Sequence, residues 1–261
     1  MNSGTMTMKA LLGAALAAAA LAGAVVAQPV NVIERPPLED KRIAVSTLVR
    51  EDIFAGIIDR DMIRFAKGEA NIDKLLDMRP GDRAGLMAWK ASALLNRAAI
   101  ANEAGDKAAY KRYFTQAVAA LDEADKAGMA DGTKLAVSGA SELLFADRLA
   151  KADQPAMWAR SYDNYQMIWK AQGAIADKLP PHLRGELMSG MVMTAQRTGR
   201  QAEAEAALEK MLVIVKDTPY ETVAKQWKAD PKMQPGSMLA CKSCHDVARL
   251  APIMSNLAPK S

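Results

Sequence analysis

Three short breaks at equal spacing divide the middle of this 261-residue chain. The segments EAGDKAA, AKADQPA and RTGRQAE place Gly105, Ala152 and Gly199 at equivalent points, and 47 residues separate each point from the next. Apolar positions after the breaks keep their offsets as well, in two sets: Val118, Tyr165, Leu212 and Leu121, Ile168, Val215. Periodicity of this kind is typical of chains built from repeated units that bury their apolar faces by stacking.

The repeated units are predicted to be helical. From about Ser46 onward Ala, Leu, Met, Gln, Lys and Glu dominate, and runs of β-branched residues are rare. The breaks join helices in pairs near residues 82–127, 134–177 and 182–216, and a fainter helix covers about Asp59–Met78. The loop signals AGMADGT, KLPPH and KDTPY separate the pairs. We therefore predict an all-α fold without strands, a short α-solenoid of about three to four helix pairs.

The helix pairs resemble tetratricopeptide (TPR) repeats. The resemblance rests on small residues at the expected helix contacts, in AAIANEAGD and AQRTGRQAEAEAALEKML, and on proline at the pair boundaries. The spacing of 47 residues exceeds the usual repeat of about 34 residues, so the resemblance implies longer helices or a divergent TPR-like class. It covers roughly residues 50–220 and implies a surface that docks another protein.

The N-terminus reads as a secretory signal. Lys9 precedes an alanine-rich apolar run, and small residues, Val25 and Ala27, stand at the −3 and −1 positions before Gln28. We predict a signal peptide over residues 1–27, with cleavage after Ala24 and a retained N-terminal anchor as alternatives. Residues 28–45 are predicted to form an extended arm, packed loosely or disordered. The expected location is the periplasm.

Charge gives little reason to expect a nucleic-acid partner. The formal net charge of +4 falls to +3 when Lys9 is removed with the signal, and no run of five basic residues occurs. After the signal, no segment is apolar enough over its length to predict a membrane span.

The pentapeptide CKSCH, residues 241–245, contains both cysteines and one of the two histidines of the chain. In C-x-x-C-H motifs the two thiols form thioether bonds to the haem vinyl groups, and the adjacent imidazole ligates the iron. The motif predicts one covalently bound haem c, with Cys241 and Cys244 as attachment points and His245 as the proximal iron ligand.

Three other interpretations of CKSCH fit the sequence less well. A structural zinc site needs four ligands, and only the remote His182 is left to add to the motif. A thioredoxin-like dithiol needs a βαβ setting, which this chain lacks. A plain disulfide suits an oxidising compartment but gives His245 no role.

The stretch CKSCHDVARL, close to the C-terminus, resembles the terminal haem-binding helix of cytochromes c′. That resemblance implies a distal haem face without a protein ligand, although cytochromes c′ are single four-helix bundles of about half this length. The candidate sixth ligands are Met233, which lies in a turn between two prolines, and then His182 and Met254. An open or water-bound face is the alternative to all three.

Two other features are interpreted as packing. Trp227 could lie against the porphyrin, but contact with the last repeat helix is at least as reasonable. Met188, Met191 and Met193 could suggest copper, but their helical spacing favours a buried core.

The segments together predict a repeat region over residues 46–220, followed by a haem-binding segment over residues 221–261. We expect an exported mono-haem c-type cytochrome that transfers one electron, with the TPR-like region docking a redox protein. The alternative is an interaction scaffold of an exported complex with a structural or gas-sensing haem. No catalytic constellation is evident, so no enzyme activity is expected unless the distal haem face is open.

Overall fold

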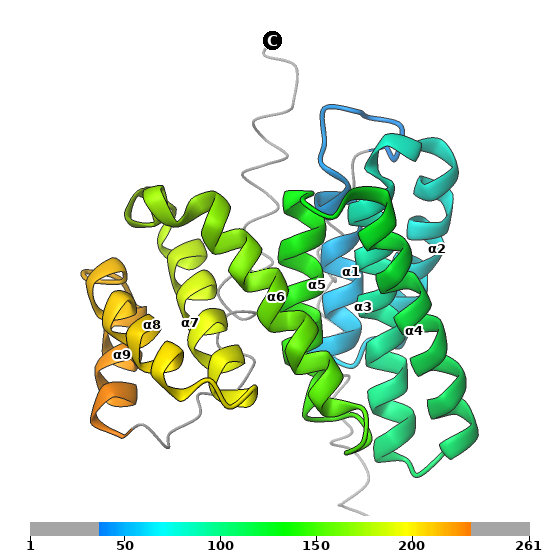
Figure 1. Ribbon diagram of the computed structural model, residues 1–261. Helices are drawn as coiled ribbons and strands as arrows, with labels where there is room; N and C mark the ends of the chain where they lie inside the picture. The colour runs from blue at the N-terminus through cyan, green and yellow to red at the C-terminus, as the bar shows by residue number, and fades with distance from the viewer. Residues whose placement is uncertain (1–36, 231–261) are drawn as a thin grey trace, which may run out of the picture. The chain divides into compact units, whose positions relative to one another are not determined.

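The computed structural model describes residues 37–230, and over that range it is all-α, with no β-strand (Figure 1). These residues belong to the second of the two units into which the chain divides, Arg35–Ser261. The α-helices are α1 (Val45–Ile58), α2 (Met62–Met78), α3 (Arg83–Glu103), α4 (Lys107–Gly128), α5 (Gly132–Ala146), α6 (Gln154–Gln172), α7 (Pro181–Arg197), α8 (Gln201–Ile214) and α9 (Tyr220–Ala229). Two short 3₁₀ helices, η1 (Pro80–Asp82) and η2 (Gly173–Lys178), follow α2 and α6. The predicted all-α class is confirmed for this part of the chain.

Aspartate side chains fix the start of three helices. Asp61 accepts hydrogen bonds from the backbone N–H groups of Ile63 (3.2 Å) and Arg64 (3.0 Å) at the start of α2. Asp106 and Asp131 each cap the following helix in the same way, at α4 and α5. Each carboxylate satisfies backbone donors that have no partner within the first turn, which sets where the helix begins.

Successive helices pack in pairs: α1 with α2, α3 with α4, α5 with α6 and α7 with α8. The last three pairs coincide with the predicted ranges 82–127, 134–177 and 182–216 to within a few residues, once η2 is counted with α6. The fainter upstream helix corresponds to α2, and α1 completes a fourth pair.

Two of the three predicted equivalent breaks have the same backbone geometry. Gly105 and Gly199 have φ values of +73° and +74°, a left-handed conformation that glycine adopts without strain. At the first break the N–H of Asp106 donates to the carbonyl of Ala101 (2.9 Å), and the N–H of Arg200 makes the matching bond at the second (2.8 Å). Both are Schellman turns that connect two helices through three residues.

The middle break is different, so the predicted equivalence of Ala152 is wrong at the level of the turn. Helix α5 ends at Ala146 and α6 begins at Gln154, so seven residues connect them. The Gln154 side chain closes this longer loop by donating from Nε2 to the carbonyl oxygens of Asp147 (3.3 Å) and Leu149 (2.9 Å).

The first helices of neighbouring pairs also lie against each other. Gly85, near the start of α3, lies close to Thr133, near the start of α5. At the other end of these helices, Asn102 Nδ2 donates to the carbonyl of Arg148 (2.9 Å). Helices α3 and α5 therefore run side by side in the same direction, which is the relation expected of equivalent helices in stacked pairs.

Apolar burial falls into two clusters. The first extends from Ile43 through α1–α5 to Met157, and the second joins residues of α5–α9 and includes Leu143, Tyr165 and Trp227. Ile43 belongs to the segment predicted as a loosely packed arm, but its side chain is buried and its carbonyl accepts a hydrogen bond from Arg79 (2.8 Å). Residues 37–44 form turns against the helices.

The boundary predicted at residue 220 falls at the start of α9. Ala224 and Trp227 of this helix are buried in the second cluster with Met211 and Val215 of the α8 region. Apolar packing therefore continues to the end of the described residues. Among helices of this part of the chain, none combines the length and apolar character needed to cross a membrane.

Candidate functional site

The residues predicted to hold haem lie outside the part of the chain that the structure describes. These are Cys241, Cys244, His245 and the proposed distal ligand Met233, together with Met254. The predicted cleavage site after Ala27 lies outside it too. The haem assignment therefore stays a prediction from the sequence.

Two residues that the sequence analysis related to the predicted haem lie among the described residues. Trp227 is fully buried on α9, and its indole Nε1 has no hydrogen-bond acceptor among the described residues. The expected contact of Trp227 with the last repeat helices is confirmed, because it packs in the cluster that includes Met211 and Val215. His182 lies partly buried in the first turn of α7.

The methionines of α7 form part of the core. Met188, Met191 and Met193 are all buried in the second apolar cluster, with Val192 between them. The packing interpretation is confirmed. Within residues 37–230 no group of three or more His, Cys, Asp or Glu side chains is arranged to hold a metal ion.

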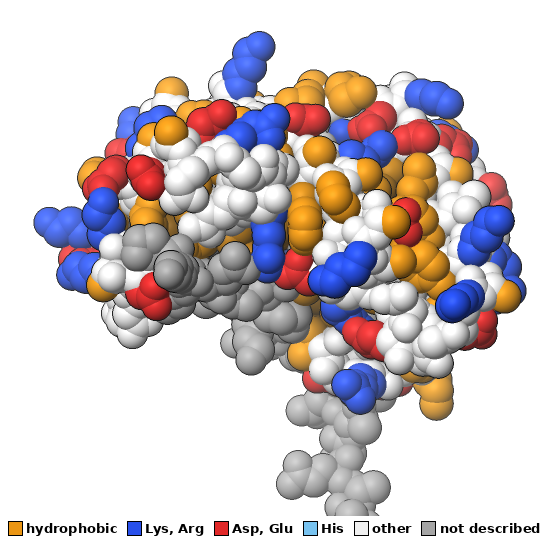
Figure 2. All heavy atoms as spheres, turned by 60° about the horizontal axis from the view of Figure 1, so that its bottom comes forward, with side chains coloured by type: hydrophobic (Ala, Val, Ile, Leu, Met, Phe, Trp, Pro, Cys, Tyr) orange, Lys and Arg blue, Asp and Glu red, His pale blue; other side chains and the backbone are white. Residues whose placement is uncertain are grey.

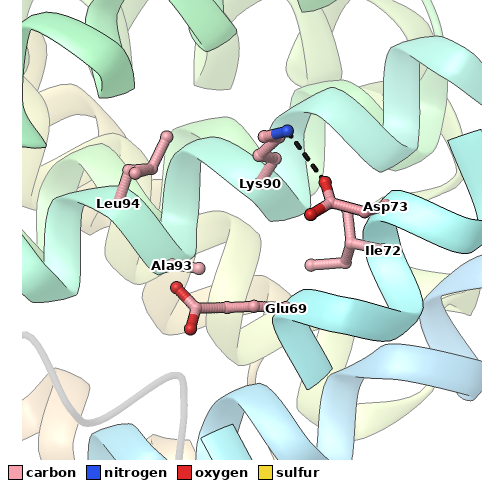
Figure 3. Close-up of a pocket in the computed structure, with 6 residues that line it drawn as sticks. All are labelled: Glu69, Ile72, Asp73, Lys90, Ala93 and Leu94. Atoms are coloured by element: carbon pink, nitrogen blue, oxygen red, sulfur yellow. Dashed lines mark hydrogen bonds and ion pairs between the residues drawn. The ribbon is translucent and has the colours of Figure 1, made fainter. Parts of the chain in front are cut away.

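A surface hollow of about 290 Å³ lies between α2 and α3 (Figure 3). Its lining combines apolar and charged side chains: Glu69, Ile72, Asp73, Lys90, Ala93 and Leu94. Lys90 Nζ pairs with Asp73 at 2.8 Å, as the dashed line in Figure 3 marks, and Glu69 pairs with Arg97 through two bonds of 2.7 and 2.5 Å. The charges at its rim are thus already neutralised within the protein.

A second hollow, of about 450 Å³, lies on the other side of α3, against α4. Lys90 and Leu94 line both hollows, and the second adds Met87, Gln116, Ala119, Ala120 and Glu123. Glu123 pairs with Arg83. The two hollows thus share residues of α3, and both are lined by small apolar patches and paired charges.

A third hollow, also of about 450 Å³, lies at α8 and α9 and is called here the α8–α9 hollow. Its lining residues are Gln196, Gln201, Ala202, Ala204, Glu205, Ala206, Leu208, Glu209 and Lys228. Ala204 and Leu208 are buried, whereas Ala202 and Ala206 are exposed. Lys228 of α9 pairs with Glu209 of α8 across the hollow.

A smaller cavity of about 150 Å³ has fewer charged side chains in its lining. It lies where α5, α6 and α7 meet, and its lining includes Leu135, Tyr165, Ile168 and Leu187, with Glu186 as its one acidic side chain. Its volume is too small for a cofactor of haem size, because typical ligand pockets measure about 300–1,000 Å³.

A buried group of charges that the sequence interpretation missed joins α4, α5 and α6. Lys134 of α5 is buried, with its Nζ bonded to Asn164 (3.0 Å) and paired with Asp125. Glu142 of α5 is fully buried and accepts from Asn164 (2.8 Å) and from Arg160 Nε (3.2 Å). Arg160 also reaches Asp125 (2.8 Å), so a single guanidinium connects helices of two pairs.

Burial raises the pKa of Glu142 to about 7, and the nearby Arg160, Asn164 and Lys134 act in the opposite direction. A shifted carboxyl can mark a catalytic site, but neither Glu142 nor its partners line any of the four hollows described above. The cluster is best explained as a structural connection. Its sequence signal is Lys134, Ser138 and Glu142 at four-residue steps on an otherwise apolar helix.

Surface charge does not single out a partner. On the face shown in Figure 2, Lys and Arg side chains are interspersed with Asp and Glu, and neither sign forms a continuous patch. Comparison of the chain with protein-family models, with curated proteins and with solved structures gives no match.

Proposed function

We propose that this protein is an exported mono-haem c-type cytochrome that transfers single electrons and docks a redox protein through a TPR-like helical repeat region. The observation that carries the proposal is the CKSCH motif at residues 241–245. The N-terminal signal pattern supports export, which suits covalent haem attachment as it occurs in c-type cytochromes. The expected location is the periplasm.

The donor set of the motif fits haem c. Two thiols separated by two residues suit the two vinyl groups, and the adjacent imidazole suits iron. Cys241 and Cys244 would hold the macrocycle at one edge, and His245 would bind the metal on one face. The bound haem supplies the one-electron redox chemistry. Met233 is the proposed ligand of the opposite face.

The helical region supports the docking half of the proposal. Four consecutive helix pairs are consistent with a TPR-like repeat. In two of the pairs, α3–α4 and α7–α8, the same Schellman turn joins the two helices. In such a repeat the first helices of the pairs line a continuous surface, and α3 and α5 have the parallel arrangement that this requires. In this proposal the described helices bind the partner protein, and the terminal segment carries the redox group.

The test is to express the full chain with a signal that directs it to the periplasm, in cells that contain a haem-ligation system. We expect a coloured protein, a mass increase equal to one haem and a pyridine haemochrome spectrum of the c type. The matched control is the Cys241→Ala/Cys244→Ala double variant, which should carry no covalent haem. Colourless wild-type protein without added mass would refute the cytochrome assignment.

A second function rests on the place of the motif, which resembles that of cytochromes c′. If the distal face has no protein ligand, the haem would bind gases or serve a structural role in a scaffold protein. Carbon monoxide distinguishes the two. Rapid and complete binding by the reduced protein would favour the scaffold or sensor, whereas absence of binding with reversible cycling at an electrode would favour electron transfer.

A further inference from the structure

The α8–α9 hollow lies at the place where the described chain ends. Lys228 lines the hollow, and the last described residue, Asp230, follows it by two positions. The sequence continues for another 31 residues, 231–261, which include the CKSCH motif. Residue 231 thus follows a lining residue of the hollow by three positions in the sequence.

The hollow and the following segment have complementary charge. The segment contains Lys232, Lys242, Arg249 and Lys260 against a single acidic residue, Asp246, so its side chains carry a net charge of +3. The hollow is lined by two carboxylates, Glu205 and Glu209, and one cation, Lys228, which already pairs with Glu209. The charge that remains to be matched at the rim is therefore negative.

The floor of the hollow suits an apolar segment as well. Ala204 and Leu208 are buried beneath it, and the small side chains of Ala202 and Ala206 leave its surface open. The segment supplies apolar side chains at short intervals, Met233, Met238, Leu239, Val247, Leu250, Ile253 and Met254. Burying such side chains against the floor would be favourable in proportion to the apolar area removed from water.

The length of the segment allows this placement. The hollow extends along α8 from Gln201 to Glu209, nine residues that span ~12 Å of helix. The 11 residues from Asp230 to Cys241 can span at most ~40 Å when fully extended, so the chain can turn back over the hollow before the motif begins.

We propose that residues 231–261 dock in the α8–α9 hollow and so place the CKSCH motif against the last helices of the repeat region. The docking itself depends only on the charge and the apolar side chains of the segment. That the docked segment carries haem rests on the proposed function. A second copy of this chain is the other possible occupant, and the experiment separates the two.

The experiment fills the hollow in the full-length protein. Ala206→Phe places a large ring on an exposed floor position, and limited trypsin digestion then measures cleavage after Lys232, Lys242 and Arg249. The matched control is Ala119→Phe, because Ala119 is an exposed alanine that lines a hollow of the same volume, about 450 Å³, on α4. We expect Ala206→Phe to speed cleavage of the segment about tenfold, which corresponds to ~1.4 kcal/mol of docking free energy.

A second pair of variants tests the charge argument. Glu205→Gln removes one carboxylate while keeping its size, and Glu123→Gln does the same at the control hollow. Cleavage of the segment should rise in Glu205→Gln and stay at the wild-type rate in Glu123→Gln. High salt should raise cleavage in the wild type, because it screens the attraction between the rim and the segment.

The outcomes decide between the occupants and do not depend on haem. Wild-type cleavage rates in Ala206→Phe, or equal increases in Ala206→Phe and Ala119→Phe, would overturn the proposal. A change of Ala206→Phe from dimer to monomer in light scattering, without faster cleavage, would assign the hollow to a second copy of the chain and would overturn it too. Protein without haem that still shows the expected cleavage pattern would refute the cytochrome assignment but support the docking.

Discussion

Replacing Gly190 with alanine should destabilise the protein, although alanine is the better helix former. Gly190 lies in α7, where the ring of Tyr165 from α6 packs directly on its Cα. A Cβ at this position would lie closer than 3.0 Å to three ring carbons, of which Cδ1 is at 2.7 Å. Carbon atoms prefer ~3.5–4.0 Å, so the overlap is about 1 Å at Cδ1 and larger at the two nearer carbons, Cε1 and Cζ.

Packing on the far side of the tyrosine ring opposes its movement away from the new methyl group, so movement can relieve only part of the overlap. Tyr165 is buried, and its other edge lies 3.4–3.5 Å from where a Cβ of Gly139 on α5 would be. The ring therefore fits between glycines of two different helices. Overpacking of this kind costs ~1–3 kcal/mol, and the extent of the overlap points to the upper end. The helix preference for alanine offsets ~1 kcal/mol, which leaves a net loss of about 2 kcal/mol.

The assay is thermal unfolding followed by circular dichroism. For a chain of this size ~2 kcal/mol corresponds to a fall of ~4–8 °C in the melting temperature. Gly132→Ala is the matched control, because nothing lies within 4 Å of its added Cβ, and it should be neutral or slightly stabilising. In a Tyr165→Leu background Gly190→Ala should become nearly neutral or stabilising. A Gly190→Ala protein that melts at or above the wild-type temperature would refute the close-packing argument.

Three further predictions concern the buried carboxyl, the turns and the motif. Because the pKa of Glu142 is about 7 in the folded protein against 4.5, its stabilising contribution is present below pH 4.5 and lost as the pH rises through 7. In urea unfolding, the free energy of unfolding of the wild type should fall by about 3 kcal/mol relative to that of Glu142→Gln as the pH rises from 4.5 through 7. A difference between the two proteins that does not change with pH would contradict this. Gly199→Ala should cost ~1 kcal/mol in the same assay, since alanine is strained at φ +74°, and an unchanged midpoint would argue against the Schellman turn. His245→Ala should keep the haem mass but change the visible spectrum, whereas Cys241→Ala should weaken or abolish covalent attachment; an unchanged spectrum in His245→Ala would remove that residue as iron ligand.

The helices could be predicted because their signals are local. Composition, loop motifs and the offsets of apolar positions located three helix pairs to within a few residues of α3–α8. The turns at Gly105 and Gly199 could be predicted to be alike, since only glycine readily takes the positive φ that both require. Alanine at position 152 lacks that freedom, and the chain there uses a longer loop that Gln154 closes. Equal spacing in the sequence thus did not ensure equal turns.

The buried charges could not be predicted in the same way. Periodicity indicates which face of a helix is buried, but it does not say which residues of other helices meet that face. Lys134 and Glu142 lie on one face of α5, while their partners Asn164 and Arg160 come from α6 and Asp125 from α4. The haem prediction is the opposite case, because it rests on the five consecutive residues of CKSCH and needs no tertiary information.

The position of the buried charges suggests a structural role for them. The α5–α6 pair contributes to both apolar clusters, with Phe145 and Met157 in the first and Leu143 and Tyr165 in the second. Apolar contacts alone would allow the two clusters to slide along this pair, because hydrophobic burial has little directional preference. Arg160 of α6 donates hydrogen bonds both to Glu142 of α5 and to Asp125 of α4, in the preceding pair. These bonds form together in only one register of the two pairs. The proposed partner surface over several helix pairs would need such a fixed register, and so would the proposed docking of residues 231–261 in the α8–α9 hollow.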